Sequence, residues 1–103
     1  MTVEQPATLT PEQLAMTRHV ADLGANPSQH GDLRLYLQNR SDADVNVVLA
    51  TAMVGKGEFE GDFPFILNYV QQPNPHLDKR AKLAGMGRNG SYFINEGLRA
   101  MGY

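Results

Sequence analysis

The chain has 103 residues, of which 42% are hydrophobic and 19% are charged, and its formal net charge is −2. These values are typical of one folded globular domain and exclude an intrinsically disordered polymer. The absence of cysteine excludes a disulfide framework, a thiolate metal site and a cysteine nucleophile.

No segment of the sequence predicts a membrane span or a secretion signal. The longest apolar run, residues 47–54, is interrupted by Thr51, whereas a bilayer span needs roughly 20 apolar residues. The first residues lack both the basic head and the apolar stretch of a signal peptide. We therefore expect a cytoplasmic protein that makes no contact with a membrane.

A first helix is predicted to begin after Thr10. The side chain of Thr10 can cap the free backbone amides, the following proline suits the first helical position, and Gln13 completes a capping box. Gly24 is a typical helix stop. We expect residues 1–9 to form a flexible tail and residues 10–103 to form a single helical domain.

The next segment, residues 32–54, has two interpretations. Residues 32–40 contain Leu33, Leu35 and Leu37, which alternate as in a strand. Leu33, Tyr36, Leu37 and Arg40 would instead line one face of a short helix, which we favour. Ser41 then begins a Ser-x-x-Asp cap, and the apolar residues after it predict a central helix buried on most sides. The alternative, given four valines, is an α+β fold with a small hairpin over 32–54.

The remainder of the chain predicts further short helices separated by glycine and proline breaks. We expect glycine turns at 55–57 and 85–90, an acidic connector at 58–62, a proline break at 71–75, and helices over 63–70, 76–84 and 93–101. The predicted fold is therefore all-α, a compact bundle of about five short helices.

Three segments carry a family resemblance. They read Asp-Leu-Arg-Leu-Tyr-Leu at 32–37, Met-Val-Gly-Lys-Gly-Glu-Phe at 53–59 and Tyr-Phe-Ile-Asn-Glu-Gly-Leu at 92–98. In these segments the chain resembles a group of short bacterial proteins catalogued as domain-of-unknown-function family 3775. The resemblance implies an all-helical bundle and no assigned activity. Lys56 stands where the family tends to have arginine, and because lysine lacks the planar fork, bidentate anion binding there is in doubt.

The glycines at 85, 87 and 90 spell Gly-x-Gly-x-x-Gly. A dinucleotide-binding site would need a strand before this motif and a long helical unit after it, whereas a basic segment precedes it and only 13 residues follow it. We interpret the motif as a flexible turn between helices. A further hypothesis is that free amides near Ser91, together with Arg88, hold an anion.

Metal binding and catalysis lack a sequence signal. The three histidines are scattered along the chain, and the acidic residues of 58–62 do not follow a calcium-loop spacing. No serine lies in a nucleophile elbow. We expect neither a metal site nor a cofactor, and the sequence favours a role without catalysis, although an enzyme is not excluded.

The leading functional hypothesis is a protein–protein interaction or homo-oligomerising module, with a homodimer as one form. Four Phe, four Tyr and five Met in a short chain are more large apolar groups than a small domain can easily hide. The candidate partner-contact residues are Lys56, Glu58, Phe59, Phe63, Tyr69 and Tyr92.

The alternative hypothesis is nucleic-acid association through the basic segment 76–88. Residues 1–75 carry four basic against nine acidic residues, which gives −5, and residues 76–103 carry five against two, which gives +3. This asymmetry fits attraction within or between chains at least as well as nucleic-acid binding. The candidate residues for nucleic acid or another anion are Lys79, Arg80, Lys82 and Arg88.

Overall fold

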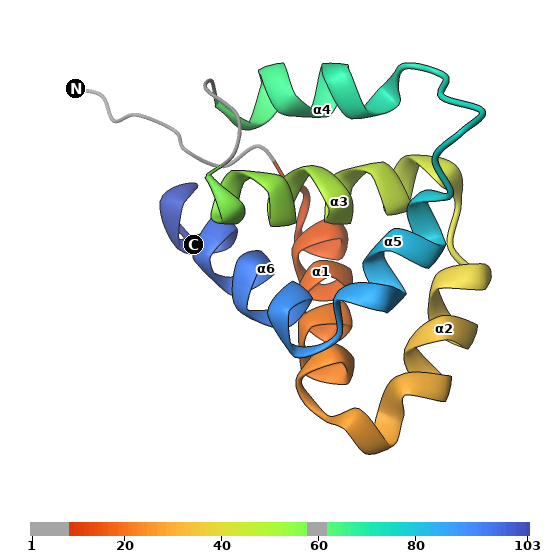
Figure 1. Ribbon diagram of the computed structural model, residues 1–103. Coiled ribbons are helices and arrows are strands. Elements are labelled where there is room, and N and C mark those ends of the chain that lie inside the picture. Colours follow the sequence, from red (N-terminus) through yellow and green to blue (C-terminus); the bar gives the residue numbers. More distant parts are fainter. Residues whose placement is uncertain (1–8, 58–61) are drawn as a thin grey trace.

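The computed structural model describes residues 9–57 and 62–103, and all regular structure in these residues is helical (Figure 1). The helices are α1 (Pro11–Ala25), α2 (His30–Gln38), α3 (Asp42–Lys56), α4 (Phe63–Gln71), α5 (Lys79–Met86) and α6 (Arg88–Ala100), with a 3₁₀ turn at Pro27–Gln29 before α2. The all-α prediction is confirmed, with six α-helices instead of about five. Helices α2 and α3 show that the hairpin alternative for 32–54 is wrong. No helix in the described part of the chain has both the length and the apolarity needed to cross a bilayer.

Four helices begin at a polar side chain that caps a free backbone amide. The capping box at Thr10 is complete, since its hydroxyl accepts from the Gln13 amide and the Gln13 side chain accepts from the Thr10 amide. Ser41, Asp62 and Asp78 each accept one hydrogen bond from the backbone amide three residues later, at the starts of α3, α4 and α5. Because such caps satisfy amides that have no partner within the helix, they fix where each helix begins.

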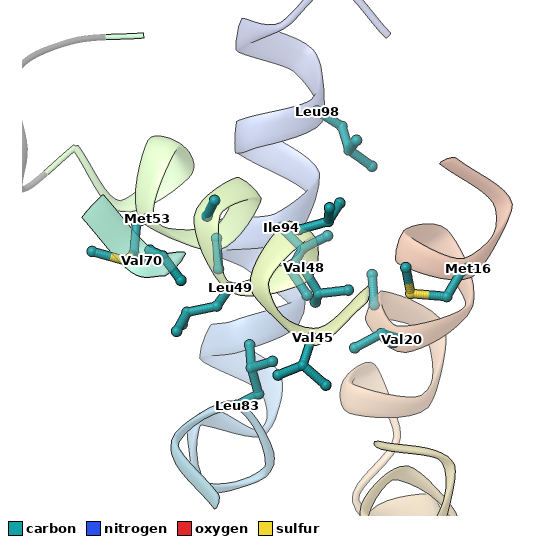
Figure 2. Close-up of a cluster of buried hydrophobic side chains, with 14 of the residues drawn as sticks. Met16, Val20, Val45, Val48, Leu49, Met53, Val70, Leu83, Ile94 and Leu98 are labelled. Atoms are coloured by element: carbon teal, nitrogen blue, oxygen red, sulfur yellow. The ribbon is translucent and has the colours of Figure 1, made fainter. Parts of the chain in front are cut away.

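Helix α3 lies at the centre of the structure, as its apolar sequence predicts. It packs against α4 on one side and against α1, α5 and α6 on others (Figure 1). Eight of its residues are buried, and Val48 and Ala50 are fully inaccessible. Figure 2 shows Val48 beside Ile94 of α6, with Val20 of α1 close by. One hydrophobic core therefore joins the N-terminal, central and C-terminal parts of the chain.

Two glycines allow the backbones of α3 and α6 to touch. A Cβ atom placed on Gly55 of α3 would lie 1.8 Å from the Phe93 carbonyl oxygen, and one placed on Gly97 of α6 would lie 2.0 Å from the Thr51 carbonyl oxygen. Both distances are far below van der Waals contact, so no other residue fits at either position. Gly55 is therefore a packing residue inside α3, and Gly57, with φ +75°, ends that helix.

The first described residue belongs to the core, so the predicted boundary after residue 9 is one residue late. Leu9 is buried, and its amide donates a hydrogen bond of 2.9 Å to the Tyr103 hydroxyl. The expected tail otherwise covers residues 1–8, which lie outside the described residues.

Gly24 does not end the first helix as predicted, because α1 continues to Ala25 and Gly24 is buried within it.

The flexible turn predicted over 85–90 is wrong. Helix α5 continues to Met86, α6 begins at Arg88, and Gly87 alone connects them. Gly87 has φ 56° and ψ −127°, a conformation that residues with a side chain rarely adopt. Gly90 lies inside α6, where an added Cβ would come within 2.9 Å of the Met86 Cβ. The tight junction at Gly87 therefore lets α5 and α6 pack against each other.

Replacing Gly97 by alanine should destabilise the protein by about 3 kcal/mol, because the added methyl group would overlap the Thr51 carbonyl and the two backbones would have to separate. Gly85→Ala is the matched control. Gly85 is also helical, its Cβ would meet nothing within 4 Å, and alanine favours the helix by up to about 1 kcal/mol. Urea unfolding followed by circular dichroism measures both. Equal stability of the two variants would contradict the close helix contact.

Candidate binding site

A pocket of about 340 Å³ opens beside the central helix α3. It is bounded by α3, α4, the connector from Gln72 to Asp78, α5 and the side of α6 that carries Phe93. Figure 1 shows how α4 lies along α3 before the connector returns the chain to α5. The volume lies at the lower end of the range of small-molecule sites, roughly 300–1,000 Å³. Its main apolar lining residues are Leu49, Met53, Val70, Leu77, Met86 and Phe93.

Three lysines are the charged residues of this pocket. Lys56 ends α3, Lys79 begins α5, and Lys82 lies one turn further along α5. Among the described lining residues there is no aspartate and no glutamate. The pocket therefore combines an apolar interior with an excess of positive charge, which would favour a ligand that is both apolar and anionic.

Lys79 is held in place by two neutral oxygens. Its ammonium group donates to the Asn46 side-chain oxygen at 2.9 Å and to the Val70 carbonyl. These bonds join α3 and α4 to the first residue of α5, and they use two of the three donors of the ammonium group. The third donor has no partner among the described residues.

Arg80 fastens α5 to the end of α2. Its guanidinium donates to the Leu37 carbonyl at 2.9 Å and to the Arg40 carbonyl, and it pairs with the Asp42 carboxylate at 2.9 Å. The carbonyls in the last turn of a helix lack partners within the helix and carry partial negative charge. Arg80 donates to two carbonyls between α2 and α3, of which the Leu37 carbonyl also accepts from the Arg40 amide, and Arg80 is therefore a structural residue.

The four basic residues predicted to bind nucleic acid do not form one free surface. Lys79 and Arg80 are engaged within the protein, as described above. Lys82 is exposed beside the pocket, while Arg88 is exposed at the start of α6 and borders a different hollow, which it shares with His30 of α2. The nucleic-acid alternative stays a prediction, and Lys82 and Arg88 are the members that make no ion pair with another described residue.

Ser91 cannot itself supply a free amide to the anion site suggested near it, and the rest of that hypothesis, which uses Arg88 and the neighbouring amides, stays a prediction. Ser91 is buried within α6, and its amide donates to the Gly87 carbonyl at 3.2 Å. The segment before the glycine motif is α5, a helix, and the described part of the chain contains no strand that could complete a dinucleotide-binding unit.

The predicted partner-contact residues have different environments. Tyr69 and Tyr92 are 56% and 62% exposed, and Lys56 is exposed with its amine 5.8 Å from the centre of the Phe93 ring. Phe63 is only 5% exposed, so it packs in the core and offers no surface to a partner. Glu58 and Phe59 lie outside the described residues.

Phe65 was not among the predicted partner-contact residues. Phe65 is 60% exposed and lies on α4 one turn before Tyr69. The buried positions of α4 are Phe63, Ile66 and Val70, whose spacing of three and four defines the inner face. Once that face is assigned, the same periodicity places Phe65 and Tyr69 together on the outer face. Leu35 of α2, 59% exposed, was also not singled out.

Within the described residues, no group of three or more His, Asp or Glu side chains is arranged to hold a metal ion. His19 instead packs edge-on against Tyr36, with ring centres 4.7 Å apart.

No protein-family model, curated protein or solved structure matches this chain. The resemblance to domain-of-unknown-function family 3775 therefore stays a prediction. The pocket and the outer face of α4 are the features from which a function can be argued.

The structural role of Arg80 predicts that Arg80→Ala lowers the free energy of unfolding by about 1–2 kcal/mol, because two carbonyls at the end of α2 lose a charged donor. Lys82→Ala is the matched control in the same helix. Lys82 is exposed, and its loss should change stability by less than about 0.5 kcal/mol. Thermal and urea unfolding compare the two variants. An equally small effect at both positions would show that the Arg80 contacts do not stabilise the fold.

Proposed function

We propose that the protein is a self-associating protein–protein interaction module, and that two copies meet through the outer face of α4. The proposal assigns no catalytic step and includes the cytoplasmic location expected from the sequence. The observation that carries it is the pair of exposed aromatic residues Phe65 and Tyr69 on that face.

Helix α4 differs from an ordinary surface helix in both composition and packing. Its nine residues include no charged side chain. Its inner face packs on α3 through Ile66 and Val70, while its outer face carries two large rings that are each more than half exposed. Surface helices normally place charged and polar residues on the face that meets water. An uncharged aromatic face is therefore better suited to a contact than to solvent.

A second copy of this chain is the partner that this face fits. In a two-fold symmetric dimer the same patch lies on both sides of the interface, so any charge on it would face its own copy. The face of α4 avoids this repulsion because it has no charge. Phe65 and Tyr69, one turn apart, would supply the aromatic anchors on which such interfaces commonly depend.

Sedimentation velocity at several protein concentrations tests the proposal. We expect a reversible monomer–dimer equilibrium, and Phe65→Glu should raise the dissociation constant at least about tenfold, because it removes an aromatic anchor and places like charges opposite each other. Leu35→Glu is the matched control, since Leu35 is equally exposed but lies on α2.

Two results would contradict this function. The first is a monomer at every concentration. The second is equal weakening by the substitutions at Phe65 and Leu35, which would show that association does not use the α4 face.

A further inference from the structure

We propose that the pocket beside α3 is a binding site for a small amphipathic anion, an apolar chain or ring that carries one carboxylate. This inference goes beyond self-association. Tyr69 lines the pocket and also belongs to the outer face of α4, whereas Phe65 does not line the pocket, so a substitution at Phe65 tests the two proposals separately.

The interior of the pocket suits an apolar body. Side chains from α3, α4, α5 and α6 converge on it, among them Leu49, Met53 and Met86. Figure 2 shows that Leu49, Met53 and Val70 come from two helices that pack side by side. Methionine adapts its shape to irregular apolar ligands, so the two methionines permit some variety in the bound group.

The charge of Lys79 is the feature that selects an anion. The side chain is half-buried, and its ammonium group bonds only to a neutral amide oxygen and a backbone carbonyl. No described carboxylate forms an ion pair with it. A partly buried charge is stabilised by an opposite charge, and no described residue supplies one to Lys79.

Two acidic residues, Asp42 and Asp78, border a neighbouring hollow together with Lys79, and both already have other roles. Asp42 pairs with Arg80, and Asp78 accepts from the Ala81 amide at the start of α5. A carboxylate supplied by a ligand would therefore meet Lys79 without competition from these groups. It would form a charge-assisted hydrogen bond, which is stronger than one between neutral groups.

Lys82 provides a second positive charge on the exposed side of the pocket. It lies in the same helix as Lys79, three residues later, so both side chains are on one face of α5. This arrangement places two positive charges on the α5 side of the pocket, whereas Lys56 lies at the end of α3. A ligand would bury its apolar part against α3 and direct its carboxylate towards α5.

Decanoate, decanol and decyltrimethylammonium are suitable probes, because they share an apolar chain and differ in the charge of the head group. Isothermal titration calorimetry below micelle-forming concentrations should show saturable binding of one decanoate per chain. Decanol and the cationic compound should bind at least about tenfold more weakly, since neither can form the charge-assisted bond. Absence of saturable decanoate binding, or equal binding of decanol, would overturn the proposal.

Substitutions at the pocket locate the site. Lys82→Gln should weaken decanoate binding about three- to fivefold, because an exposed charge is partly screened by solvent. Leu77→Glu, which places a negative charge in the lining, should weaken it at least about tenfold. Arg18→Gln is the matched control, because Arg18 is an exposed basic residue of α1 outside this pocket. Thermal unfolding establishes that each variant is folded.

The outcome at Arg18 decides between a site and a general charge effect. Equal weakening by Lys82→Gln and Arg18→Gln would overturn the assignment to this pocket.

The Phe65→Glu variant separates the two proposals. It should bind decanoate as tightly as the original chain, whether or not the chain dimerises, and a matching loss of both properties would refute the independence of the pocket.

Discussion

The close contact between the backbones of α3 and α6 is the constraint on which the rest of the structure depends. Because Gly55 and Gly97 let the two helices touch, α3 is fixed in the centre with little space on that side. Its remaining apolar surface must then be covered by other elements, and α1, α4 and α5 cover it. The pocket forms where that cover is incomplete, between α4 and α5.

The two basic residues at the start of α5 hold neighbouring helices together and contribute little free positive charge to the surface. Lys79 and Arg80 are adjacent, yet one bonds to α3 and α4 while the other bonds to the end of α2 and the start of α3. Together they fix the position of a short helix that has few buried residues of its own. Two of the four basic residues that predict nucleic-acid binding in the sequence, Lys79 and Arg80, thus form contacts within the protein.

The parts of the fold that were predictable are those determined by local chemistry. Thr10 and Ser41 each cap the helix that follows, and the cap at Ser41 favours a buried helix over a strand for the apolar run after it. The errors concern positions whose role depends on a distant partner. Gly55 resembles a helix stop until α6 lies against it, and Phe65 resembles a core residue until the inner face of α4 is known. The site follows the same rule, since Lys79 and Leu49 become neighbours only in the folded chain.

The hydrogen bond between Leu9 and Tyr103 places the two ends of the described fold next to each other. Joining these ends by a short linker would close the backbone into a ring without moving any helix, because neighbouring termini tolerate such a connection. The exposed connector between α4 and α5 could then be cut to create new termini. The order of the helices along the chain would change while their contacts remained. The packing of these helices therefore does not require that α1 comes first in the sequence.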